Sequence, residues 1–115
     1  MPDLTPAAVY PGRIRSRTEG GGTGCRLELF DWGIRMRGSA VMKPFVPVFE
    51  LRYGELTEAR LVAAHVNRGV RFQADCLSAA VTFVTFQDRE IADRLEERGV
   101  PVDRDVGQLG CLPGD

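Results

Sequence analysis

The stretch Val81-Thr82-Phe83-Val84-Thr85-Phe86, which runs on into Gln87-Asp88-Arg89-Glu90-Ile91, decides the fold. Its first six residues are all β-branched or aromatic, a composition typical of a β-strand. From residue 88 the hydrophobic spacing changes, and Ile91, Ala92 and Leu95 fall on one face of a helix. The chain therefore predicts a strand over 80–86 followed by a short helix over 88–98.

The predicted helix has recognisable ends. Asp88 is expected as its N-cap, because a carboxylate there can accept backbone amide hydrogen bonds. Gly99 is expected as the left-handed residue that follows the helix, with Val100 against Leu95 as in a Schellman ending. Pro101 prevents any continuation. The Gly-rich, polar residues 103–115 predict a flexible tail.

Upstream of this stretch the hydrophobic period is two. Leu27 and Leu29, for example, alternate with Arg26 and Glu28, which predicts a strand with one buried and one solvated face. Gly and Pro residues divide the chain between such runs, and the Gly-rich segment 20–24 is expected to form a flexible hairpin loop. Together with 80–86, the predicted strands cover residues 13–18, 25–30, 33–38, 48–53, 58–66 and 70–74. Residues 58–66 are also compatible with a helix by propensity.

Composition limits the classes of protein that fit. The 115 residues suit one domain over 1–115, with an ordered core over roughly 10–102. A net charge of −1 gives no indication of nucleic-acid binding. The chain contains no apolar run long enough to cross a membrane and begins without a secretory signal. Cys25, Cys76 and Cys111 are widely spaced, which argues against a disulfide framework or a metal site and favours the cytoplasm.

Seven antiparallel strands followed by one helix predict a mainly β fold, a β-barrel with one C-terminal α-helix. This pattern resembles the pleckstrin-homology-like (PH-like) superfold, and in particular the small bacterial PH-like domains. The residues that carry the resemblance are WGIRMRG at 32–38, VFELRYGEL at 48–56, and VTFVTF at 81–86 leading into LEERGV at 95–100. The resemblance implies two nearly orthogonal sheets, capped at one open end by the helix, over about residues 10–102. It also implies a binding scaffold for lipid headgroups, peptides or copies of itself.

An arginine-rich strand face is the first candidate binding site. Its members are expected to point outward from neighbouring strands, and they are Arg13, Arg15, Arg17, Arg35 and Arg37. Arginine forks suit phosphate oxygens, so an anionic lipid headgroup or a phosphorylated ligand would fit this face. The alternative is an ordinary solvated face that acidic residues balance. The loop 19–24 lacks Lys and Arg, whereas lipid-binding PH domains carry basic residues around this loop.

Aromatic residues near turns are the second candidate site. Trp32, Phe45 and Phe49 would form an apolar patch for a protein partner if they were exposed, and otherwise they close the barrel end. Cys25 is expected in the core, whereas Cys76 and His65 form a conceivable catalytic pair. The sequence thus favours a non-catalytic protein-binding module without metal or cofactor, and self-association into a homo-oligomer. An anionic-ligand binder and a Cys/His enzyme are the alternatives.

Overall fold

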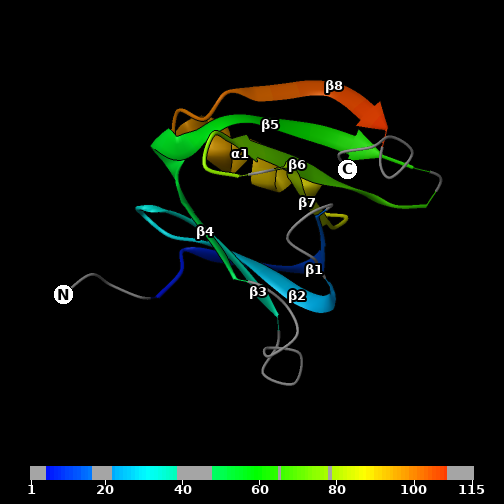
Figure 1. Ribbon diagram of the computed structural model, residues 1–115, viewed down its shortest axis with the longest axis horizontal. Coiled ribbons are helices and arrows are strands. Elements are labelled where there is room, and N and C mark those ends of the chain that lie inside the picture. Colours follow the sequence, from blue (N-terminus) through cyan, green and yellow to red (C-terminus); the bar gives the residue numbers. More distant parts are fainter. Residues whose placement is uncertain (1–4, 17–21, 39–47, 65, 78, 109–115) are drawn as a thin grey trace.

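The computed structural model describes residues 5–16, 22–38, 48–64, 66–77 and 79–108 (Figure 1). Most of the elements along the chain are β-strands. They are β1 (Ala8–Ser16), β2 (Gly22–Leu29), β3 (Gly33–Gly38), β4 (Phe49–Arg52), the 3-10 turn η1 (Tyr53–Glu55), β5 (Leu56–Ala63), β6 (Arg68–Ala74), β7 (Val81–Val84), α1 (Asp88–Glu97) and β8 (Val102–Gln108). Within these described residues, no helix has the length and apolar character needed to cross a membrane.

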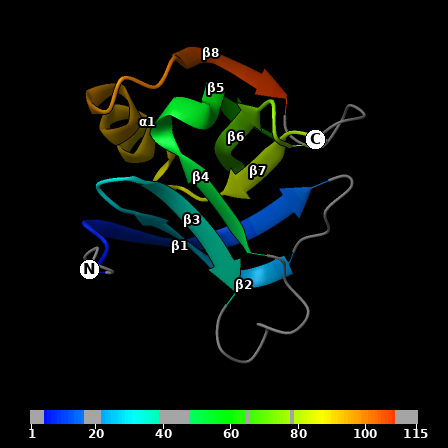
Figure 2. The same cartoon turned by 60° about the vertical axis from the view of Figure 1, so that its left-hand side comes forward.

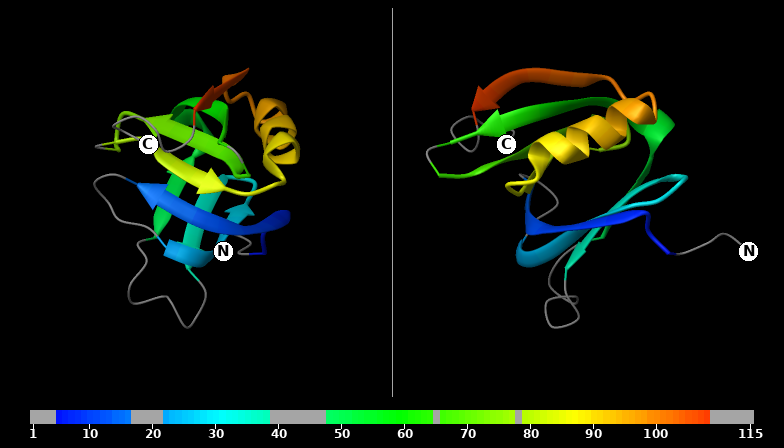
Figure 3. Two further views of the ribbon diagram at one scale, coloured as in Figure 1. Left: turned by 90° about the vertical axis from the view of Figure 1, so that its right-hand side faces the viewer. Right: turned by 180° about the vertical axis from the view of Figure 1, so that it is seen from behind.

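The strands form one sheet of eight, in the order β4-β3-β2-β1-β7-β6-β5-β8. Every neighbouring pair is antiparallel except β5 and β8, which are parallel. The β5–β8 half lies above the β1–β4 half, and the two halves are seen most clearly in Figures 2 and 3. The prediction of a mainly β fold with one helix is therefore confirmed.

The prediction of seven strands in two sheets closed into a barrel is wrong. β1 joins both halves into one sheet, because its first part pairs with β2 and its last residues pair with β7. Its register against β2 shifts between Gly12 and Ile14, because β2 has one more residue than β1 over this stretch. Among the described residues β4 and β8 are the two edges, and they are not hydrogen-bonded to each other.

The eighth strand was not expected, because residues 103–108 were predicted to be part of a flexible tail. Val102 packs against the core, and Asp103 Oδ2 lies 2.7 Å from Arg60 Nη2 on β5. Arg104 adds ion pairs to Asp93 and Glu96 on α1. Because these contacts join β8 to β5 and α1, the segment forms an edge strand although its polar and apolar residues do not alternate.

The core lies between the two halves of the sheet. Leu27 and Ile34 come from the lower half, Leu61 and Phe72 come from the upper half, and all four are at most 1% exposed. α1 packs against β5, β6 and β8, and its buried face consists of Asp88, Ile91, Ala92 and Leu95. The strand prediction for 58–66 is confirmed for residues up to 63, and the helical alternative is wrong because β6 and β8 pair with β5 on both sides.

The helix ends as predicted but begins differently. The amide of Val100 donates to the Leu95 carbonyl and that of Gly99 donates to the Glu96 carbonyl, with Gly99 at φ 83°, which is a Schellman ending. The N-cap is Gln87 rather than Asp88. Asp88 instead lies in the first turn, where it is buried and its Oδ1 is 3.0 Å from Arg68 Nε.

Candidate functional site

The predicted arginine face is divided by the sheet register into two groups. Arg35 and Arg37 on β3 lie opposite Glu28 and Arg26 on β2. All three arginines converge on Glu28, whose carboxylate oxygens lie 2.8 Å from Arg35 Nε, 3.1 Å from Arg37 Nε and 3.9 Å from Arg26 Nε. Glu28 itself is only 3% exposed. We call Glu28, Arg26, Arg35 and Arg37 the Glu28 cluster. Arg35 and Arg37, which were expected to bind a ligand, are thus already ion-paired with Glu28.

Arg13 and Arg15 belong to the other group. They pair with β7, where Arg13 lies opposite Val84 and Arg15 lies opposite Thr82. Among the described residues, neither arginine has a carboxylate at ion-pair distance. Arg17 lies outside the described residues. The four described arginines of the predicted face are therefore divided between these two groups.

The structure brings Arg15 to different arginines, which the sequence analysis missed. Thr82 lies opposite Arg71 on β6, and Arg71 lies opposite Arg60 on β5. Successive cross-strand partners therefore form the line Arg15, Thr82, Arg71 and Arg60, which we call the Arg15 row. Burial lowers the pKa of Arg71, the charge of Arg60 lowers it further, and the charge of Glu58 opposes both effects.

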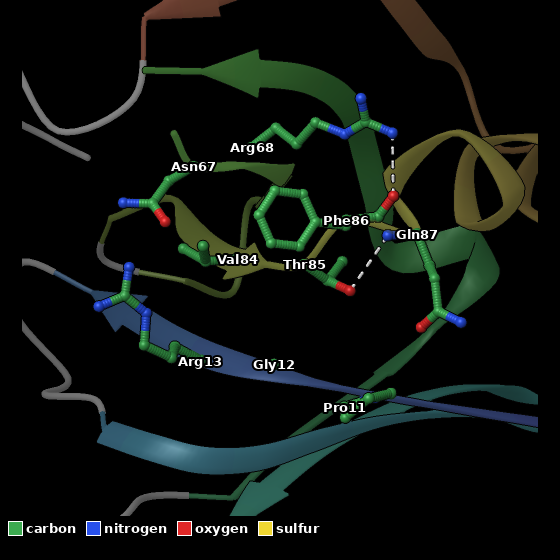
Figure 4. Close-up of a pocket in the computed structure, with 9 residues that line it drawn as sticks. All are labelled: Pro11, Gly12, Arg13, Asn67, Arg68, Val84, Thr85, Phe86 and Gln87. Carbon is green, nitrogen blue, oxygen red and sulfur yellow. Dashed lines mark hydrogen bonds between the residues drawn. The ribbon is translucent and has the colours of Figure 1, made fainter. Parts of the chain in front are cut away.

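An apolar hollow opens beside this row, where β1, β6 and the turn after β7 meet (Figure 4). Its volume is about 330 Å³. The residues around it are Pro11, Gly12, Arg13, Asn67, Arg68, Val84, Thr85, Phe86 and Gln87. Most of the exposed surface inside the hollow is apolar, and it is therefore suited to an apolar side chain.

Phe86 is the most exposed aromatic residue in the described structure, and it stands at the rim of this hollow. It is 69% exposed, and its carbonyl accepts a hydrogen bond from Arg68 Nη2 at 3.0 Å. The amide of Gln87 donates to Thr85 Oγ1 at 3.3 Å, which holds the turn that presents the ring (Figure 4). This exposure was not predicted, because Phe86 was expected to be the last residue of a strand that in fact ends at Val84.

Two glycines at or next to the hollow lie very close to β7. A Cβ on Gly12 would lie 2.3 Å from the Val84 carbonyl oxygen, and one on Gly69 would lie 2.2 Å from the Phe83 carbonyl oxygen. Both positions therefore require the close approach that glycine allows. Gly12 lines the hollow itself, and Gly69 follows the lining residue Arg68.

The two described residues of the predicted aromatic patch, Trp32 and Phe49, do not form an exposed patch. Phe49 is buried in the core at 6% exposure, and Phe45 lies outside the described residues. Trp32 stacks on Phe30 with ring centroids 5.1 Å apart, and the guanidinium of Arg35 lies 4.9 Å from the Phe30 ring centroid. Trp32 thus covers Phe30 next to the Glu28 cluster rather than joining an open patch.

The remaining chemical candidates are the cysteines and His65. Cys25 is buried, as predicted, and burial raises the pKa of its thiol. Cys76 is exposed, but His65 and Cys111 lie outside the described residues, so the Cys76–His65 pair stays a prediction. Where the structure is described, no three His, Cys, Asp or Glu residues are grouped so as to hold a metal ion. The chain matches no known protein-family model and no curated protein.

Proposed function

We propose that this chain is a non-catalytic PH-like module that binds protein, and that its partner is a second copy of itself. The strand order supports the PH-like part of this proposal. β1 to β4 form one antiparallel meander, β5 to β7 form a second, and α1 follows β7. β8 is an addition to the pattern that the resemblance implies.

The exposed Phe86 beside the hollow is the observation that carries self-association. An aromatic ring next to an apolar hollow on the same face is self-complementary, since a twofold axis would place each ring in the hollow of the other copy. Burial of an aromatic side chain is among the largest contributions to interface energy. Because the face is small, the dimer is expected to be weak and concentration-dependent.

The chemistry of the hollow supports a binding role rather than catalysis. Its described lining residues include two arginines and two amides, but no carboxylate or imidazole that would serve as a general base. Arg68 is already engaged by Asp88. We also propose a cytoplasmic location, because Cys76 is a free thiol.

Sedimentation equilibrium over a wide concentration range tests this proposal. The wild-type chain should pass from monomer to dimer as the concentration rises, and Phe86→Ser should weaken the dimer by about tenfold or more. Val106→Ser is the matched control, because Val106 is 54% exposed but lies on β8, away from the hollow. A chain that stays monomeric at every concentration, or a Phe86→Ser protein that dimerises like wild type, would contradict the proposal.

A further inference from the structure

Arg13 brings a positive charge to the edge of the apolar hollow. It lines the hollow together with Val84, which lies opposite it on β7. Directly opposite residues of antiparallel strands have their side chains on the same face of the sheet, with Cβ atoms about 5 Å apart. The Arg13 side chain therefore leaves the sheet next to the apolar base of the hollow.

The base of the hollow is separate from the main core. Val84 is 7% exposed and forms a small apolar cluster with Val62. Its neighbour Phe83 points the other way and belongs to the main core. The hollow is thus a second apolar site, on the outer face of the sheet. Its volume of about 330 Å³ falls within the usual range for small-molecule pockets, about 300–1,000 Å³.

The two arginines of the hollow differ in their charge balance. Arg68 Nε lies 3.0 Å from Asp88 Oδ1, and Arg68 Nη2 donates to the Phe86 carbonyl oxygen at 3.0 Å. Arg13 has no carboxylate at ion-pair distance in the described segments of the chain. None of the lining residues is acidic. The hollow therefore combines an apolar base with a positive charge that its own lining does not neutralise.

A phenyl ring would match only the apolar part of this hollow. A ligand with an apolar body and a carboxylate would match both parts, because the two carboxylate oxygens can accept paired hydrogen bonds from one guanidinium group. In Figure 4, the side chains of Arg13 and Asn67 stand at one end of the hollow, and Pro11 and Gln87 stand at the other. The Asn67 amide group is a further hydrogen-bond donor at the Arg13 end.

We propose that the hollow binds a small apolar monocarboxylate, of the kind of a medium-chain fatty acid, and that this ligand displaces the second copy. Its hydrocarbon body would lie on Val84 and against the Phe86 ring, and its carboxylate would accept hydrogen bonds from Arg13. The displacement rests on the proposed self-association, since both occupants need the same hollow. The binding of the carboxylate does not rest on it.

Parallel titrations of the full chain with octanoate and with octanamide, followed by nuclear magnetic resonance, test the site. The two probes share a hydrocarbon body, but only octanoate is charged. The wild-type protein should bind octanoate with saturation and about tenfold or more tightly than octanamide. Dimerisation would compete equally with both probes, so the ratio of their dissociation constants is independent of it.

Arg13→Gln should abolish the preference for octanoate. Arg15→Gln is the matched control, because Arg15 is on the same strand and is also partly buried, but does not line the hollow. It should keep the preference within about twofold of wild type. Equal affinity of the wild-type protein for the two probes, non-saturable binding of octanoate, or a preference that survives in Arg13→Gln would overturn the proposed site.

Sedimentation equilibrium with saturating octanoate tests the displacement. The wild-type dimer should dissociate, whereas the same concentration of octanamide should have a much smaller effect. A chain that dimerises equally with and without octanoate would overturn the displacement. A chain that is monomeric even without octanoate would overturn both self-association and displacement, and the carboxylate site would then be supported or overturned by the titrations alone.

Discussion

The Glu28 cluster and the Arg15 row lie on the same outer face of one sheet, but they differ in how their charge is balanced. In the cluster, three arginines surround a carboxylate that is 3% exposed. In the row, Asp103 pairs with Arg60 at one end, and the arginines around Thr82 lie directly opposite one another or one strand apart. The comparison shows that the strand register determines which arginines lie next to a carboxylate. Residue type and alternation along a single strand do not reveal these neighbours.

The largest expected effect concerns the core that underlies both groups. Leu95→Ala should lower the free energy of unfolding by about 2–5 kcal/mol, because Leu95 is fully buried on the face that α1 turns toward the sheet. Urea denaturation measures this loss. A loss below about 1 kcal/mol would show that the buried face of α1 contributes little to the stability of the fold.

Glu28→Gln should have the next largest effect. It removes the one carboxylate from the cluster and leaves three positive charges facing each other. Loss of a buried partner costs up to about 5 kcal/mol, but these arginines are partly exposed, so about 1–3 kcal/mol is expected. The same denaturation experiment applies. An unchanged midpoint would mean that the cluster is no better balanced than the row.

Asp103→Asn removes the carboxylate that pairs with Arg60 in the Arg15 row. It should lower the free energy of unfolding by less than Glu28→Gln does. The pair it breaks is roughly one-third exposed on each side, and surface pairs contribute about 0.2–1 kcal/mol. If the loss equalled that of Glu28→Gln, the distinction between the two groups would fail.

Alkaline pH should lower the free energy of unfolding through Tyr10, independently of either arginine group. Burial raises the pKa of Tyr10 to about 12, and Glu90 on α1 acts in the same direction. Because the folded-state pKa lies above the unfolded value of about 10, the neutral phenol contributes stability that is complete below about pH 10 and is lost as the pH rises toward 12. Unfolding midpoints followed through this range should fall less steeply for Tyr10→Phe than for wild type. Equal slopes would contradict the burial of this phenol.

Local patterns explain which parts of the fold could be predicted. The alternation in β3 and the Gly99-Val100-Pro101 ending of α1 depend on neighbouring residues, and both were found from sequence. The register shift between β1 and β2 and the parallel pairing of β8 depend on other strands, so no local pattern indicated them.

The candidate site was harder to predict for the same reason. Arg15 was recognised, but its neighbours Thr82 and Arg71 come from strands more than fifty residues away in the sequence. Phe86 was assigned to a strand because the VTFVTF pattern continues two residues beyond the real end of β7. One signal was present, since residues 86–87 immediately precede a helix and such positions often form turns.

The most direct test of the contrast between the two groups is a side-by-side comparison of the free energies of unfolding of wild type, Glu28→Gln and Asp103→Asn. We predict a clearly larger loss for Glu28→Gln, because the Glu28 carboxylate is buried among three arginines, whereas the Arg60–Asp103 pair is partly exposed. Equal losses would contradict the conclusion that the register, by placing Glu28 among the arginines of β2 and β3, makes this carboxylate the more important one.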